Sequence, residues 1–183
     1  MKRALALCLG LALSAGPLLA DGCPEAPDHD AALSALLDRV RAAPTEMEGR
    51  QIANEMWALW ADAPDEPSQH MLDEGMQARS GYDFLRALDR FDRLVDYCPH
   101  YAEGYNQRAF VNFLRQDFDA ALPDLDRAIA INPRHVGALA GKALTLMGLG
   151  REAEAQEALR AALALNPWLS ERSLLKEPPG QKL

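Results

Sequence analysis

Aromatic and basic residues are both scarce in this sequence. The first shortage bears on the fold class and the second on the possible partners. Aromatic side chains make up 7% of the 183 residues while alanine and leucine are abundant, which favours helix over sheet. The 19 lysine and arginine residues are outnumbered by 27 aspartate and glutamate residues. Because nucleic acids and anionic lipid surfaces are bound through clustered basic side chains, the sequence predicts neither as a partner.

The motifs of common catalytic and metal sites are also missing. The sequence has no glycine-rich phosphate loop, no Gly-x-Ser-x-Gly turn and no cysteine–histidine pair of a nucleophilic enzyme. Its four histidines are scattered and form no recognisable metal-ligand motif. The acidic run between residues 117 and 126 lacks the glycine and the final glutamate of a calcium loop. We therefore expect no enzyme activity, no cofactor and no metal.

A long apolar run occurs only at the start of the chain. Lys2 and Arg3 precede the apolar stretch 4–15, and a small-residue segment ends at Ala20. This layout predicts a signal peptide over residues 1–20, with an uncleaved membrane anchor as the alternative. No later run reaches about 18 apolar residues, so no membrane span is expected after cleavage. The predicted location is the bacterial periplasm.

The chain has few cysteines, and cleavage after Ala20 would remove one of the three. Cys23 and Cys98 would remain, and an even pair in an exported protein suggests a disulfide. The competing interpretation is that Cys23 is a lipidated N-terminal cysteine. The residues before it lack the leucine three places upstream that bacterial lipoprotein signals usually have.

The most informative feature of the sequence is a repeat with a period of 34 residues. The positions that recur at this step are Pro99, Pro133 and Pro167; Ala87, Ala121 and Ala155; and Gly75, Ala109 and Ala143. A fixed period of this length indicates a solenoid, in which each unit packs mainly on its neighbours. Three units are predicted, over residues 68–101, 102–135 and 136–169, each with two helices. The expected fold is all-α.

The segments on either side of the repeats are less regular. Residues 21–67 read as an extended lead-in followed by a degenerate helical pair, and we expect this pair to start the stack because its apolar residues fall near the repeat positions. Residues 170–183 are expected to form a short capping helix and a tail.

The repeated units resemble the tetratricopeptide repeat, of an exported bacterial type. The middle unit shows the pattern most fully, with Tyr105, Ala109, Phe118, Ala121, Leu125, Ala128, Asn132 and Pro133. The resemblance implies a right-handed superhelical stack of antiparallel helix pairs. The units depart from the pattern in three ways. None has its tryptophan, Asn112 needs a hydrogen-bond partner if it is buried, and Pro123 is expected to kink the second helix or delay its start.

The resemblance also implies a function and a site. Repeats of this family are scaffolds that bind proteins or peptides in a groove formed by the first helix of each unit. Carried over by position, the groove residues are Leu72, Met76 and Arg79; Asn106, Phe110 and Phe113; and Ala140, Leu144 and Met147. The alternative is that Met76, Phe110 and Phe113 pack against neighbouring helices. Only Arg79 and Asn106 match the Lys, Arg and Asn cluster with which some family members hold a partner's terminal carboxylate, so such capture is not expected.

In this repeat the start of a first helix and the end of a second helix lie at one edge of the stack. The resemblance therefore places Cys23 and Cys98 at the same edge, where a disulfide can form. The function that we expect is a periplasmic scaffold or adaptor, with a lipid-anchored subunit of an envelope-assembly complex as the alternative. The sequence does not identify the partner or the oligomeric state.

Overall fold

The computed structural model describes residues 22–176 of the chain, so the predicted signal peptide and the end of the C-terminal tail lie outside the described residues. Within that range the protein is all-α, as expected, with eight α-helices and one short 3₁₀ helix, η1. The helices are α1 (Asp30–Ala42), α2 (Glu46–Trp60), α3 (Glu66–Ser80), α4 (Phe84–Tyr97), α5 (Ala102–Leu114), α6 (Phe118–Ile131), α7 (Val136–Gly148), α8 (Glu152–Leu165) and η1 (Ser170–Leu174). None of the described helices is long and apolar enough to cross a membrane.

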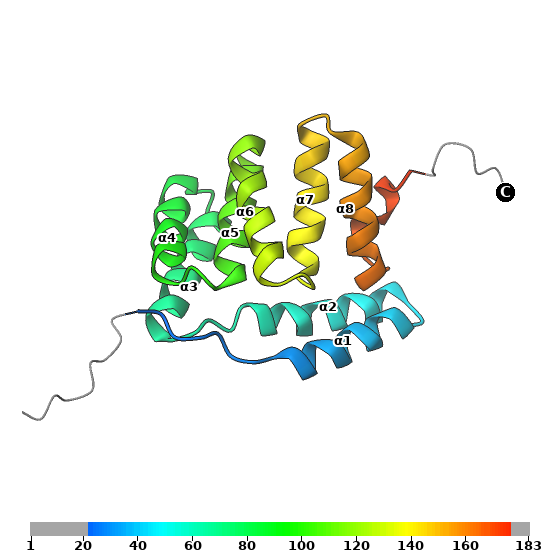
Figure 1. The fold of residues 1–183 in the computed structure, drawn as a ribbon, viewed down its shortest axis with the longest axis horizontal. Helices are drawn as coiled ribbons and strands as arrows, with labels where there is room; N and C mark the ends of the chain where they lie inside the picture. Colours follow the sequence, from blue (N-terminus) through cyan, green and yellow to red (C-terminus); the bar gives the residue numbers. More distant parts are fainter. Residues whose placement is uncertain (1–21, 177–183) are drawn as a thin grey trace, which may run out of the picture.

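Helices α3 to α8 stand side by side as three antiparallel pairs, which is the predicted stack (Figure 1). Several of the helices begin after a residue whose side chain caps the N-terminus. Asp83 and Asp117 cap α4 and α6 by accepting hydrogen bonds from backbone N–H groups three residues later. Helix α6 begins at Phe118, the position that matches Phe84 one repeat earlier, so Pro123 does not delay its start.

Small residues at the repeat positions let the two helices of each pair approach closely. Ala109 and Ala143 in the first helices, and Ala87, Ala121 and Ala155 in the second, are completely buried. In the first pair the equivalent residue is Gly75, and a Cβ added there would lie 2.4 Å from the ring of Phe91. No side chain can be added at that distance without moving the buried ring.

Helices α1 and α2, which we call the strap, do not lie where the sequence predicts. They form a helical pair, but instead of starting the stack they run crosswise under it, along the edge that holds the turns between units (Figure 1). The expected position was wrong because Ile52 and Met56 pack with α1 and with Val136 and Trp168 at the far end of the chain. The strap therefore packs on the last unit of the stack.

Direct contacts fix the strap to both ends of the stack. Trp168 packs on the backbone of α2 at Gly49, where an added Cβ would lie 2.4 Å from the indole. At the other end the Tyr101 hydroxyl donates to the Trp60 carbonyl over 2.7 Å. Burial and the nearby charge of Glu103 raise the pKa of Tyr101, so the hydroxyl keeps its proton.

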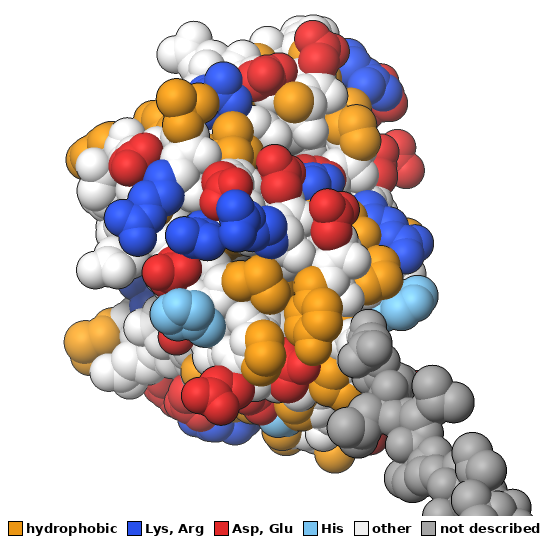
Figure 2. All heavy atoms as spheres, turned by 90° about the vertical axis from the view of Figure 1, so that its left-hand side faces the viewer, with side chains coloured by type: hydrophobic (Ala, Val, Ile, Leu, Met, Phe, Trp, Pro, Cys, Tyr) orange, Lys and Arg blue, Asp and Glu red, His pale blue; other side chains and the backbone are white. Residues whose placement is uncertain are grey.

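Because the strap lies under the stack, the outer face of the first unit has no helical neighbour among the described residues. Figure 2 shows this end of the molecule, where basic and acidic side chains alternate. Glu74 pairs there with Arg90 at 3.0 Å, and Asp89 pairs with Arg93 at 3.2 Å. Charged pairs cover the end that another repeat would otherwise cover.

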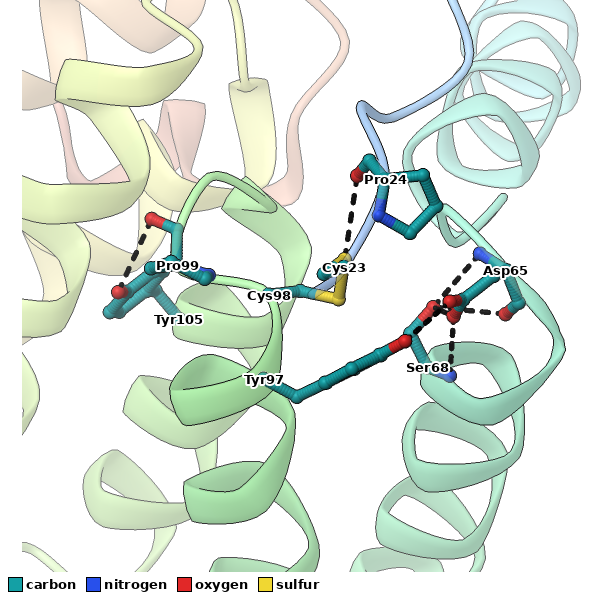
Figure 3. Close-up of a disulfide and its surroundings, with 8 residues drawn as sticks. All are labelled: Cys23, Pro24, Asp65, Ser68, Tyr97, Cys98, Pro99 and Tyr105. Atoms are coloured by element: carbon teal, nitrogen blue, oxygen red, sulfur yellow. Dashed lines mark hydrogen bonds between the residues drawn. A yellow bond between two sulfur atoms is a disulfide. The ribbon is translucent and has the colours of Figure 1, made fainter. Parts of the chain in front are cut away.

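A disulfide ties the lead-in to the first unit (Figure 3). It joins Cys23 to Cys98, with 5.0 Å between the Cα atoms and a sequence separation of 75. Beside it, the Tyr97 hydroxyl and the Ser68 hydroxyl and N–H donate to Asp65. Burial raises the pKa of Asp65, but these hydrogen bonds outweigh it and hold the pKa below its usual value.

Replacing Gly75 with valine should destabilise the stack. The new side chain has to displace Phe91, and overpacking of this kind typically lowers the free energy of unfolding by about 1–3 kcal/mol. Chemical denaturation measures the change. Gly81→Val is the control, because a Cβ at this exposed position meets nothing closer than 3.5 Å. Equal stabilities for the two variants would contradict the proposed close approach.

Removing the disulfide should lower stability without changing the fold. Cross-linking residues this far apart restricts the unfolded chain and contributes about 4 kcal/mol at most. We expect Cys23→Ala with Cys98→Ala to lose roughly 2–4 kcal/mol in the free energy of unfolding. Added reductant should destabilise the native protein by a similar amount and leave the double variant unchanged. Finding both thiols free in the denatured native protein would contradict the bond.

Candidate functional site

A cavity of about 390 Å³ lies between the first helices of the three units. We call it the groove. It is lined by Arg79 of α3, by Asn106, Phe110 and Phe113 of α5, and by Ala140 and Leu144 of α7. Phe110 keeps 43% of its surface exposed, although it lies in this hollow. An exposed aromatic ring in a mostly apolar cavity is typical of a binding site.

Three of the residues predicted to line the groove lie elsewhere. Leu72 is fully buried in the core of the first unit, and Met76 packs against that core. Met147, in the last turn of α7, packs against the core formed with α8. The alternative of packing against neighbouring helices therefore holds for Met76. It holds in part for Phe113, whose ring lies 5.6 Å from that of Phe118.

The sequence pattern missed the residues that close the groove at its edges. Trp57 of the strap lines the cavity with 43% of its surface exposed, and Leu169 and Glu171 line it from the C-terminal segment. These residues lie outside the helices that form the groove in the repeat pattern. Their position depends on the crosswise strap and on the chain after α8, which the 34-residue period does not describe.

Arg79 supplies the positive charge of the groove. Its guanidinium lies 4.7 Å from the centre of the Phe110 ring and donates to the Gln107 amide oxygen over 2.6 Å. Burial lowers the pKa of Arg79, while the charge of Glu103 acts in the opposite direction. An arginine remains protonated in either case, so the groove contains a fixed cation.

A buried carboxylate organises the polar residues beneath the groove. The Glu103 side chain is completely buried and accepts hydrogen bonds from Asn106 at 3.0 Å, from Gln107, and from His135 Nε2 at 2.8 Å. His135 Nδ1 accepts the backbone N–H of Ala138 and so caps α7. Because Nδ1 is an acceptor, the ring proton lies on Nε2 and is donated to Glu103.

The same histidine connects this network to the strap. The Trp60 ring stacks on the His135 ring with 4.5 Å between the centres. A chain of contacts therefore runs from the strap through His135, Glu103 and Gln107 to Arg79 in the groove.

Asn112, the buried polar residue that the repeat pattern does not explain, has a hydrogen-bond partner. Its side-chain oxygen accepts a hydrogen bond from Arg115 at 3.3 Å.

A second cavity, of about 410 Å³, lies where the lead-in crosses the turns between units. Two pairs of polar side chains that line it already contact each other. His29 lies 2.7 Å from Asp62, and Arg134 lies 2.7 Å from Asp30. Among the described residues no group of three or more His, Cys, Asp or Glu could hold a metal ion. The groove is therefore the stronger candidate for a binding site.

Comparisons with known proteins point to one family. Residues 113–168 match the family model described as tetratricopeptide repeat. A TPR repeat-containing protein of Rhizobium etli is 32% identical over 101 residues, which are 55% of this chain and 50% of that protein. The tetratricopeptide repeat protein 36 homolog of Nematostella vectensis is 40% identical over 70 residues, which are 38% of either chain. The chain thus spans half or less of the length of these two relatives.

Solved structures of the same kind share the fold. The TPR2B domain of yeast Sti1 in complex with pHsp70 matches with a TM-score of 0.55 and 26% identity, over 59% of this chain and 90% of that domain. The first TPR of Spaghetti (RPAP3), bound to an HSP90 peptide, matches with a TM-score of 0.58 and 20% identity, over 59% of this chain and 86% of that one. In both comparisons the matched share of this chain is close to the share that the three helix pairs of the stack occupy.

Replacing His135 with leucine should destabilise the protein strongly. The change removes the cap of α7 and leaves the buried Glu103 carboxylate without one of its donors. Leaving a buried charged group short of a hydrogen-bond donor costs about 1–3 kcal/mol and losing a helix cap about 1 kcal/mol, so we expect the free energy of unfolding to fall by roughly 2–4 kcal/mol. Thermal and chemical denaturation measure the effect. The exposed His100 provides the control, because His100→Leu should change stability by no more than about 0.5 kcal/mol.

Proposed function

This chain is a tetratricopeptide-repeat protein, and from that premise we propose that it is a scaffold that binds a segment of a partner protein in the groove. The observation that supports the proposal is the partly exposed aromatic surface inside the cavity. Phe110 and Trp57 each keep 43% of their surface exposed there. Covering such rings with an apolar side chain of a partner would provide much of the binding energy.

The ligand differs in kind from those of similar repeat domains. The TPR2B domain of Sti1 is in complex with pHsp70. In this chain Arg79 is the only basic residue that lines the groove within the described range. A single arginine does not reproduce a cluster of basic and amide side chains around a terminal carboxylate. We favour an apolar partner segment rather than a chaperone tail.

On this proposal the protein is an adaptor rather than an enzyme. The buried histidine near the groove is occupied as a helix cap and as the donor to Glu103. Glu103 itself is fully enclosed by its three donors. Neither group is placed to move a proton to or from a bound molecule.

The proposed location is the periplasm of a bacterium, reached through the signal peptide expected over residues 1–20. The disulfide supports an oxidising compartment, because such bonds are rare in the cytosol. The alternative is a lipid-anchored envelope subunit. The sulfur of Cys23 that a lipid would need is joined to Cys98, which favours the unanchored form. Mass spectrometry of the mature N-terminus distinguishes the two.

Removing the aromatic surface of the groove should abolish partner binding. We expect Phe110→Ala with Phe113→Ala to lose at least tenfold in the recovery of specifically crosslinked partners from the native envelope, because buried aromatics dominate such interfaces. Tyr82→Ala with Leu85→Ala is the matched control, since these apolar residues are 82% and 76% exposed outside the groove.

Circular dichroism should show that both double variants are folded, and Phe110→Glu offers a single change if loss of Phe113 weakens the core. Recovery of the same partners by the groove variants and the native protein would refute the proposed site.

A further inference from the structure

Two opposite charges line the groove without an ionic partner among residues 22–176. Arg79 of α3 forms no ion pair in that range, and its hydrogen bond to Gln107 engages one of the five N–H groups of a guanidinium. Glu171 of η1 accepts a hydrogen bond from the Ser170 hydroxyl and is likewise in no ion pair there. Most other lysine and arginine side chains in that range form ion pairs, such as Arg172 with Glu46 at 2.6 Å, which sets Arg79 apart.

The two charges come from opposite ends of the stack. Helix α3 belongs to the first unit and η1 follows the last one, with α5 and α7 between them (Figure 1). Between the charges the groove presents the apolar side chains Phe110 and Leu144. The cavity is therefore positive at one end, apolar in the middle and negative at the other end.

The size of the cavity limits what can occupy it. The volume is about 390 Å³, the space that on the order of a dozen waters occupy. Two leucine side chains and one phenylalanine side chain would fill a similar volume. An α-helix with its side chains is about 10–12 Å wide and needs a broad open channel. Here Trp57 and Leu169 close the edges, so an extended segment fits better.

The spacing of the helices sets the length of that segment. Packed helix axes lie about 8–10 Å apart, and an extended chain advances about 3.3 Å per residue. The apolar part of the groove, between Phe110 on α5 and Leu144 on α7, therefore takes roughly three extended residues.

From these observations we infer that the groove takes a short extended segment with an acidic side chain toward Arg79, about three apolar residues, and a basic side chain toward Glu171. This inference rests on the proposed function and adds the charge pattern of the ligand. A partner without the acidic group would leave the half-buried cation without a direct ion pair, which weakens binding. The pattern thus determines specificity, while the apolar residues provide most of the affinity.

The test uses the disulfide-bonded protein and labelled peptides in fluorescence anisotropy. Each peptide has blocked ends and a Leu-Phe-Leu centre, flanked by Asp and Lys, by Asn and Gln, by two Asp or by two Lys. We expect the Asp–Lys peptide to bind about three- to tenfold more tightly than the Asn–Gln peptide at low salt, with a smaller ratio at 0.5 M salt.

Charge reversal in the protein should reverse the preference. Glu171→Lys should favour the peptide with two Asp by a similar factor, and because η1 contributes no buried residue, the replacement leaves the core intact. Arg79→Gln should remove the preference for the acidic flank. The control for net charge is Glu157→Lys, on the exposed surface of α8 outside the groove, which should leave the preference of the native protein unchanged.

Equal binding of all four peptides would overturn the charge pattern and leave the proposed groove function standing. Failure of every peptide to bind would also overturn the inference, whatever the groove variants do to partner capture. If Glu157→Lys shifted the preference as much as Glu171→Lys, overall charge rather than the groove would explain it.

Discussion

The close approach of paired helices at one small residue per helix is the constraint on which the rest of this structure depends. Where Gly75 faces Phe91, no Cβ can be accommodated, and the corresponding positions in the other units are fully buried alanines. Because each pair is held at this short distance, the first helices of successive units line up and leave a groove between them. A larger residue at any of these positions would change the spacing of the groove as well as the stability.

The strap adds a second constraint, which acts along the length of the stack. Repeat proteins normally gain stability from neighbouring units alone, so their ends can move apart. Here α2 touches Trp168 near the C-terminus, and Trp60 at its other end stacks on His135 and accepts a hydrogen bond from Tyr101. The disulfide from Cys23 to Cys98 restrains the chain that leads into the strap. We therefore expect a stack of nearly fixed curvature, which favours a groove of fixed width.

The sequence predicted most of the features that repeat, and it missed the position of the strap, which does not repeat. Proline and alanine spacing defined the three units, and the helices of the second and third begin at Ala102 and Val136 as expected. Six of the nine residues assigned to the groove line it. The position of the strap was missed because Ile52 and Met56 match the repeat pattern, while the residues that hold them lie eighty or more positions away at Val136 and Trp168.

The buried Glu103 explains how these constraints meet at the groove. Burying a carboxylate is unfavourable unless its oxygens are hydrogen-bonded, and replacing such groups by apolar residues is often neutral or stabilising. Stability alone therefore does not account for it. Its three donors are Asn106 and Gln107 beside the groove and His135 beneath the strap. The Glu103 carboxylate thus holds in place both the polar groove residues and the His135 ring on which Trp60 stacks. A shift of the strap would have to break or move bonds to Glu103, and through Gln107 it would displace Arg79.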